Sequence, residues 1–177
     1  MRLIVVTGMP GAGKEEFLSA GMAAGIPFAR MGDAVRELYS GSSAQKEGVP
    51  MGQFASSERE LHGKDIWAKR TLEKMKGESI FIIDGCRSMD EIRSFKNLGG
   101  EVVTVGIYAP PQVRYERLVK RGREDAPADL NAFNERDSRE LSWGVGEVLA
   151  LCDFMVPNTG SLEDFHKRSA ELMRSLQ

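Results

Sequence analysis

The chain has 177 residues, of which 41% are hydrophobic, and a formal net charge of −2. This length and apolar content suffice for one compact core, so we expect a single domain spanning residues 1–177. A general nucleic-acid binder is usually distinctly basic, so the slightly acidic balance predicts no specific nucleic-acid partner.

The cysteines and the apolar segments indicate the cellular setting. Cys86 and Cys152 lie far apart and form no Cys-x-x-Cys pair, which argues against a disulfide framework or a zinc site and fits a reducing cytoplasm. The only strongly apolar N-terminal stretch, Leu3–Val6, is too short for a signal peptide or a membrane span. We therefore expect a cytoplasmic protein with no membrane partner.

Short apolar runs alternate with longer amphipathic stretches along the chain. In chain order, the pattern predicts strands at Leu3–Thr7, Pro27–Met31, Ser79–Ile83, Glu101–Tyr108 and Phe154–Val156. It predicts helices at Glu15–Ala24, Asp33–Tyr39, Phe54–Lys76, Met89–Leu98, Pro111–Arg121, Leu130–Leu151 and Leu162–Leu176.

Finer features of these elements can also be predicted. Asp33 is the expected N-cap of its helix, Gly41–Gly52 is an expected loop, and the Phe54–Lys76 helix has a candidate break at His62–Gly63. The continuously apolar run Ser79–Ile83 is typical of a strand buried on both faces of a parallel sheet. Strand–helix alternation around such a strand predicts an α/β fold with about five parallel strands.

The segment from Gly8 to Lys14 matches the pattern G-x-x-x-x-G-K, between a predicted strand and a predicted helix. Its backbone N–H groups and the helix N-terminus attract phosphate oxygens, while Lys14 adds a point charge for the β- and γ-phosphates. The fold is therefore expected to be a three-layer α/β/α P-loop NTPase that binds a nucleoside triphosphate. The predicted nucleotide-binding residues here are Gly8, Met9, Pro10, Gly11, Ala12, Gly13, Lys14, Glu15 and Glu16.

Glu15 departs from the usual motif, in which Ser or Thr follows the lysine and binds Mg²⁺ through its hydroxyl. A carboxylate at this position either contacts Mg²⁺, directly or through water, or favours the helix N-terminus. Without a metal it would repel a triphosphate. Glu15 is therefore a candidate Mg²⁺ ligand, and whether it supports or impairs metal binding stays open.

The P-loop GMPGAGK resembles that of the adenylate kinase group of phosphotransferases. Met31–Arg36 (MGDAVR) is similar to the GDxxR element of that group, and Asp84–Arg87 (DGCR) is similar to its DGxxR-type segment. The resemblance implies that Arg36 and Arg87 bind the acceptor phosphate and that Asp84 lies near Mg²⁺. The alternatives are a solvated helix arginine at Arg36 and a turn residue at Asp84.

Two further segments resemble donor-side elements of such kinases. Tyr115–Arg121 is similar to the helix that enters the lid, which implies that Arg117 stacks on adenine and that Arg121 meets the phosphates, with Arg136 adding charge. The segment containing Asn158 and Gly160 resembles a loop of dephospho-coenzyme A kinases that contacts the donor adenine. Any single lid arginine could equally be a solvated helix residue.

The segments Ala109–Leu118 (APPQVRYERL), Glu135–Glu140 (ERDSRE) and Gly144–Asp153 (GVGEVLALCD) extend the resemblance. With them, the whole chain resembles an archaeal family of adenylate-kinase-like P-loop proteins with no settled substrate. The resemblance implies an acceptor-binding insert at 32–76 and a short lid at about 121–140. It predicts an Mg²⁺- and ATP-dependent kinase that phosphorylates a nucleoside monophosphate or another small phosphorylated acceptor. The residues predicted to act in catalysis are Lys14, Arg121, Asp33 and Arg136.

Two alternatives remain open at this point. The first is a hydroxyl kinase similar to dephospho-coenzyme A kinase, for which Asp33 stands where that family keeps an aspartate. The second is a nucleotide-binding switch or weak ATPase without a small-molecule acceptor, which Glu15 favours because impaired Mg²⁺ binding would slow the chemistry.

Overall fold

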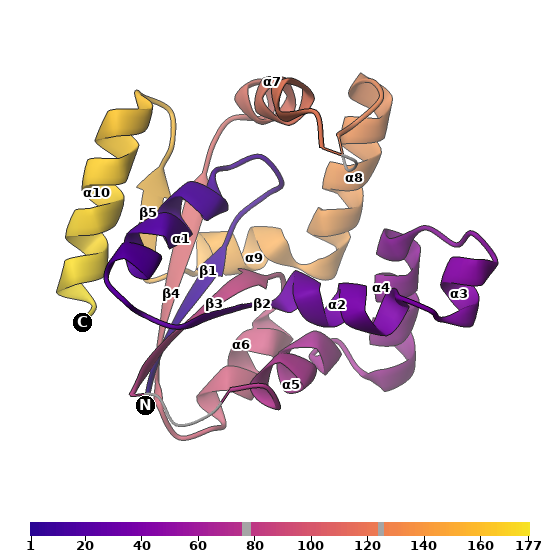
Figure 1. Ribbon diagram of the computed structural model, residues 1–177, viewed down its shortest axis with the longest axis horizontal. Coiled ribbons are helices and arrows are strands. Elements are labelled where there is room, and N and C mark those ends of the chain that lie inside the picture. The colour runs from indigo at the N-terminus through magenta and orange to yellow at the C-terminus, as the bar shows by residue number, and fades with distance from the viewer. Residues whose placement is uncertain (76–78, 124–125) are drawn as a thin grey trace.

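The computed structural model describes residues 1–75, 79–123 and 126–177 (Figure 1). Its five strands form one parallel sheet in the order β2-β3-β1-β4-β5, as the alternating pattern predicts. The strands are β1 (Arg2–Thr7), β2 (Phe28–Arg30), β3 (Ile80–Cys86), β4 (Glu101–Tyr108) and β5 (Phe154–Pro157).

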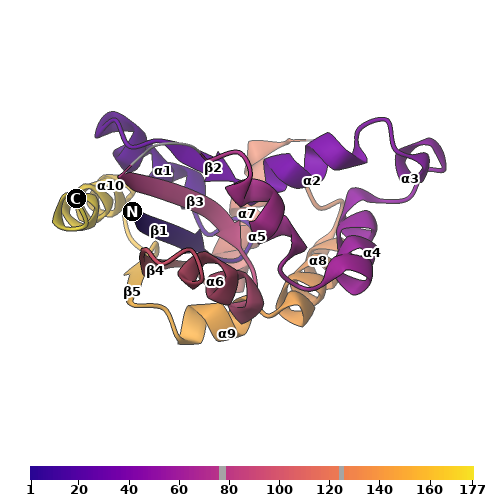
Figure 2. The ribbon, with the colours of Figure 1, turned by 90° about the horizontal axis from the view of Figure 1, so that it is seen from below.

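Helices cover both faces of this sheet, so the three-layer α/β/α fold is confirmed (Figures 1 and 2). One face carries α1 (Lys14–Ala23) and α10 (Leu162–Ser175). The opposite face and its extension carry α2 (Met31–Tyr39), α3 (Ser43–Lys46), α4 (Met51–His62), α5 (Ile66–Leu72), α6 (Met89–Lys96) and α9 (Val145–Ala150). The remaining helices are α7 (Pro111–Arg121) and α8 (Leu130–Trp143).

Consecutive residues of β1 are apolar because they pack alternately into the cores on the two faces of the sheet. Leu3 and Val5 pack into the core beneath α2, α5 and α6, while Ile4 and Val6 pack into the core beneath α1 and α10. All four side chains are fully buried. A central strand of a parallel sheet meets apolar layers on both sides, so the period-two alternation of a half-exposed strand is absent. No helix of the described residues is long and apolar enough to cross a membrane.

Three local predictions differ from the structure. Helix α2 begins at Met31 directly after β2, so Asp33 lies in its first turn and the prediction of an N-cap is wrong. The predicted loop Gly41–Gly52 contains the short helix α3 and the start of α4. The single helix predicted at Leu130–Leu151 is two helices, because Gly144 adopts a φ of +108° between α8 and α9.

The break predicted at His62–Gly63 is confirmed, since α4 ends at His62 and α5 begins at Ile66. The end of the predicted helix at Lys76 lies outside the described residues, as do residues 124–125 of the predicted lid. The P-loop follows central strand β1, with β3 on one side and β4 on the other. In open α/β sheets, ligands bind at the carboxyl ends of the strands where the strand order reverses. Helices α7 and α8 lie above this edge in Figure 1.

Candidate nucleotide-binding and phosphotransfer site

The P-loop presents backbone donors at the carboxyl edge of the sheet. Gly11 and Gly13 have φ angles of +80° and +105°, and a Cβ at Gly13 would come within 2.2 Å of the Asn158 amide. Glycine is therefore required for the tight turn. Within the described ranges, the N–H groups of Gly13, Lys14 and Glu15 donate no hydrogen bond. Such donors at a helix N-terminus are placed to receive an anion.

Lys14 lies over the loop that it follows. Its Nζ donates a 2.6 Å hydrogen bond to the Gly8 carbonyl and lies 3.4 Å from the Met9 carbonyl. Burial lowers the pKa of Lys14, while the nearby Asp84 carboxylate opposes that effect. Phosphate oxygens would be stronger partners for this ammonium group than two carbonyls, so Lys14 is positioned to exchange them for a bound phosphate.

Asp84 lies near the end of β3, in register with Val6 of β1 and Arg30 of β2. The residue is 8% exposed. Its Oδ2 is 3.9 Å from Arg30 Nε, whereas its buried Oδ1 has no hydrogen-bond partner among the described residues. Burial raises the pKa of Asp84 above its ordinary value, against the opposing charges of Lys14, Arg87 and Arg30.

The unsatisfied oxygen of Asp84 fits a hard divalent cation. Mg²⁺ prefers oxygen ligands and is usually bound by one or two carboxylates together with phosphates and water. No cluster of three or more His, Cys, Asp or Glu side chains suited to a metal occurs in the part of the chain that the structure describes. The donor set therefore suits a cation held by Asp84 and by the nucleotide phosphates rather than by a protein cage.

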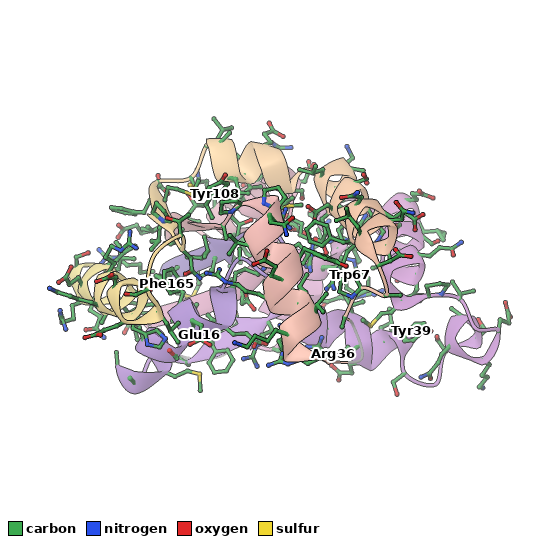
Figure 3. All side chains as sticks on the ribbon, turned by 90° about the horizontal axis from the view of Figure 1, so that it is seen from above. Glu16, Arg36, Tyr39, Trp67, Tyr108 and Phe165 are labelled. Atoms are coloured by element: carbon green, nitrogen blue, oxygen red, sulfur yellow. The ribbon has the colours of Figure 1, made fainter. Side chains whose placement is uncertain are left out.

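The two acidic residues at the start of α1 have different partners. Arg123 donates one 2.8 Å hydrogen bond to each carboxylate oxygen of Glu15, and these bonds lower the pKa of Glu15. Glu16 Oε2 lies 2.8 Å from Nε2 of His166 in α10, and Glu16 is labelled on that side of the molecule in Figure 3. Direct binding of Mg²⁺ by Glu15 would therefore first require the release of Arg123.

Arg87 follows β3 and is held by α8. Its Nε donates a 2.6 Å hydrogen bond to Glu140 Oε2, and its Nη1 donates a 2.8 Å bond to the Gly85 carbonyl. Burial alone would raise the pKa of Glu140, but the ion pair with Arg87 leaves that pKa lowered. The charges of Arg87, Glu140 and Arg136 also act on Lys14. Helix α8 thus brings a carboxylate and an arginine to the phosphate side of the P-loop.

Asp33 and Arg36 form an ion pair with each other on α2, and both side chains are 56% exposed. The Arg36 guanidinium lies over Gly32 in the first turn of this helix. Viewed from above in Figure 3, Arg36 lies on the α2 side of the site and Glu16 on the α10 side. Arg36 therefore lies on α2 and is paired with Asp33, and its binding of an acceptor phosphate stays a prediction.

Asn158 supports the P-loop from behind. It is 3% exposed, and its Nδ2 donates a 2.9 Å hydrogen bond to the Ala12 carbonyl. Arg117 Nη2 donates to the Asn158 carbonyl at 3.1 Å and to its Oδ1 at 3.3 Å. The Asn158 amide is therefore buried against the loop, and the prediction that the segment of Asn158 and Gly160 contacts the donor adenine stays a prediction. Gly160 lies in the exposed turn between β5 and α10.

Arg114 of α7 is a residue of the site that no sequence motif predicts. This residue is 3% exposed and donates hydrogen bonds of 2.8 and 2.5 Å to the two carboxylate oxygens of Asp137 in α8. It also donates a 3.2 Å bond to the Pro10 carbonyl. Arg114 thus links α7, α8 and the P-loop. Both partners lie in segments that carry the family resemblance, but no local pattern reveals a pairing across 23 positions.

The second part of the predicted lid forms α8, which is attached to the core by two ion pairs. Asp137 binds Arg114, and Glu140 binds Arg87. These two acidic residues are three positions apart and therefore share a face of the helix. Arg121 lies at the end of α7, and its charge lowers the pKa of Glu15.

The parallel sheet, the P-loop after its central strand and the charged groups at its carboxyl edge define a P-loop kinase-like protein. A family model described as an AAA domain matches residues 4–141. A UPF0200 protein of Thermoplasma volcanium is 43% identical over 171 residues, covering 97% of this chain and 96% of the relative. One of Sulfurisphaera tokodaii is 39% identical over 176 residues, covering 99% and 98%. The chain belongs to the UPF0200 family of archaeal proteins, which confirms the resemblance.

Solved structures with the same fold include known kinases. TT1252 from Thermus thermophilus superposes with a TM-score of 0.65 at 17% identity, covering 99% of this chain and 97% of that chain. A shikimate kinase from Acinetobacter baumannii in complex with shikimate gives a TM-score of 0.59 at 13% identity, covering 98% and 93%. A gluconokinase from Sinorhizobium meliloti gives 0.60 at 17% identity, covering 98% and 91%. At these identities the likeness shows the P-loop kinase fold.

Proposed function

We propose that the protein is an ATP-dependent phosphotransferase whose acceptor is a small phosphorylated molecule, with a nucleoside monophosphate as the first choice. The observation that carries the proposal is the convergence of three cations, Lys14, Arg87 and Arg30, around the buried carboxylate of Asp84, with Arg136 of α8 acting on Lys14. Phosphoryl transfer needs such an arrangement, because negative charge spreads over the equatorial oxygens of the transferring group. A protein that only binds a nucleotide has little use for cations on both sides of the phosphates.

On the donor side, Lys14 and the P-loop N–H groups would bind the β- and γ-phosphates of ATP. Asp84 would hold Mg²⁺, which supplies charge neutralisation at the phosphates. Arg121 and Arg136 would stabilise charge on the transferring group. Arg117, held by Asn158, and the exposed turn at Gly160 lie on the side of the P-loop where the donor base would be placed.

On the acceptor side, Arg36 and Arg87 would bind the acceptor phosphate. A phosphate acceptor is already anionic, so this reaction requires no strong general base. The Asp33–Arg36 ion pair also favours a second candidate, transfer to a hydroxyl as in a dephospho-coenzyme A kinase. Asp33 would then take the hydroxyl proton, and the adjacent arginine would bind an anionic group of the same acceptor.

A coupled assay of ATP turnover with Mg²⁺ tests the proposal, using AMP, CMP, dCMP, UMP and dephospho-coenzyme A as acceptors. We expect one nucleoside monophosphate to raise turnover well above the rate with ATP alone. Lys14→Met should lower the stimulated rate by about 10²–10³-fold, because the variant loses a charge that acts on the transferring phosphate. Slow hydrolysis that no acceptor changes would contradict the kinase and favour a nucleotide-binding switch.

The variant Asp33→Asn separates the two kinase candidates. Loss of a general base lowers kcat by about 10²–10⁴-fold with a hydroxyl acceptor. With a phosphate acceptor the same change should act mainly on KM, through the Asp33–Arg36 ion pair. We place the enzyme in the cytoplasm, since both cysteines are free thiols and the reaction uses ATP and Mg²⁺.

A further inference from the structure

Trp143, the last residue of α8, lies where the acceptor-side insert meets the core. The guanidinium of Arg59 in α4 is 4.6 Å from the centroid of its ring, and that of Arg87 is 5.5 Å from it. The indole Nε1 donates a 3.0 Å hydrogen bond to Ser56 Oγ, also in α4. One side chain of α8 therefore contacts both the insert and an arginine of the proposed acceptor site.

Each arginine on this ring also has a carboxylate partner. Arg59 lies 3.2 Å from Glu91, and these side chains are 7% and 0% exposed. Arg87 lies 2.6 Å from Glu140, and its backbone N–H donates a 2.6 Å bond to Glu91. Charge-assisted hydrogen bonds in a buried setting hold both groups in one geometry. Glu140 and the Trp143 ring therefore hold the Arg87 guanidinium in place from two sides.

The hydrogen bonds of Arg87 leave one end of its guanidinium available. Nε donates to Glu140 and Nη1 donates to Gly85, while Nη2 has no hydrogen-bond partner in residues 1–75, 79–123 and 126–177. Nη2 is also not one of the buried side-chain atoms that lack a hydrogen-bond partner in these ranges, so it is not sealed from solvent. This nitrogen is the donor that an incoming anion would meet.

We propose that Glu140 and Trp143 are positioning residues that direct Arg87 Nη2 towards the acceptor, and that Trp143 couples this arginine to the position of α4. The inference rests on the proposed function, which gives Arg87 its acceptor role. When an acceptor binds against the insert and moves α4, Ser56 and Arg59 move with that helix. The indole contacts both residues, so its contact with Arg87 changes when they move. Acceptor binding thereby changes the position of the Arg87 charge relative to the reacting phosphates.

Four variants of the 177-residue chain separate the parts of this arrangement. Trp143→Leu removes the ring and its hydrogen bond, Trp143→Phe keeps an aromatic face, Ser56→Ala removes only the hydrogen bond, and Glu140→Gln removes the charge. We expect Trp143→Leu to raise the acceptor KM about tenfold, as the loss of a desolvated cation–π contact implies. Glu140→Gln should act in the same direction. Trp143→Phe should retain most of the wild-type acceptor KM, and the KM for ATP should change less than about twofold in the Trp143 and Ser56 variants.

Trp67 offers a matched control. It also lies beneath an arginine, with the Arg70 guanidinium 5.1 Å from its ring, and it donates a 3.3 Å hydrogen bond to the Ala55 carbonyl. It is fully buried in the core that also contains Leu3 and Val5 of β1. Trp67→Phe should lower the thermal midpoint without raising the acceptor KM relative to the KM for ATP. If Trp67→Phe and Trp143→Leu raise the acceptor KM equally, Trp143 has only a structural role and the proposal is wrong.

Fluorescence supplies a readout that does not depend on turnover. The chain has two tryptophans, so Trp143 is the only one in Trp67→Phe. Its emission should respond to the active acceptor in the presence of ADP, and much less to ADP alone. A response to ADP alone, or a wild-type acceptor KM in Trp143→Leu, would overturn the coupling while leaving the kinase intact. Absence of any acceptor-dependent turnover in the wild type would instead remove the proposed function, and the coupling with it.

Discussion

The proposed donor and acceptor sides of the site differ in how Arg114 and Arg36 are held. On the donor side, the Arg114 side chain is 4% exposed and makes a two-point ion pair with Asp137. On the acceptor side, Arg36 and its partner Asp33 are each 56% exposed. The first pair connects two helices and the P-loop, whereas the second connects neighbouring turns of a single helix.

This difference indicates what each side must do. A buried ion pair gives little net stability but fixes the geometry of the elements that it joins. An exposed ion pair contributes about 0–1 kcal/mol and is exchanged at little cost for another partner. We infer that the donor side is built in advance for a nucleotide, while Arg36 on the proposed acceptor side exchanges its ion pair with Asp33 for contacts to the substrate; Arg87, by contrast, is held by Glu140.

The largest effect is expected from breaking the donor-side pair. Arg114→Leu leaves the Asp137 carboxylate without its partner, and loss of one member of a buried pair costs about 3–5 kcal/mol. Chemical denaturation should show this loss directly. The double variant Arg114→Leu with Asp137→Leu should recover much of it, because no uncompensated charge remains. If Arg114→Leu lowers the free energy of unfolding no more than Arg36→Gln does, the donor side is not preformed in this way.

The next largest effect concerns Asp84, where stability and activity should change in opposite directions. Burial raises the pKa of this carboxyl above 3.8, so its ionised form destabilises the fold. The wild type should therefore gain stability relative to Asp84→Asn as the pH falls through the raised pKa towards 3.8. At neutral pH, Asp84→Asn should be at least as stable as the wild type, yet turn over about 100-fold more slowly because it loses its Mg²⁺ contact.

Thermal midpoints at neutral and acidic pH, measured without nucleotide, give the stability part of this prediction. The Mg²⁺-dependent part of the ATP-induced midpoint shift gives the metal part, since a ligand that binds only the folded state raises its stability. A variant that loses stability at neutral pH but keeps the Mg²⁺-dependent shift would show that Asp84 is a structural residue.

The sequence predicts the elements of this protein well where the signal is local. The P-loop, the apolar strands and the break after His62 all follow from spacing and residue type. The start of α2 is missed because the end of β2, rather than a capping side chain, determines where that helix begins. The break at Gly144 is missed because the residues on both sides of it continue a helical pattern.

The contacts of the site are harder to predict, since they join distant parts of the chain. Asn158 lies in a segment that resembles a ligand-binding loop, but the fold buries its amide behind Ala12. The bond between Arg87 and Glu140 spans 53 positions. Such pairs depend on the docking of α8, which no periodic pattern specifies.

On the acceptor side, Arg36→Gln should leave stability within about 0.5 kcal/mol of the wild type, because the ion pair that it removes is exposed. The acceptor KM should rise about tenfold, as expected for the loss of one charge-assisted contact, while the KM for ATP stays constant. Lys46→Gln, a change to another basic residue of the insert, is the matched control and should alter neither KM. An unchanged acceptor KM in Arg36→Gln would mean that the pair with Asp33 persists and that the acceptor binds elsewhere.

The smallest effect is expected at Glu15. Its ion pair with Arg123 lies on the donor side but is exposed, so it is an exception to the difference between Arg114 and Arg36. Glu15→Ser removes a negative charge near the phosphates and the two hydrogen bonds that Arg123 donates to this carboxylate. ATP without Mg²⁺ should then bind up to about fivefold more tightly, in line with the strength of an exposed pair. Glu16→Ser, at the next position but paired with His166, should have a smaller effect. Equilibrium titrations with and without Mg²⁺ measure both variants. Weaker binding by Glu15→Ser only when Mg²⁺ is present would instead identify the carboxylate as a metal ligand that releases Arg123 when the nucleotide binds.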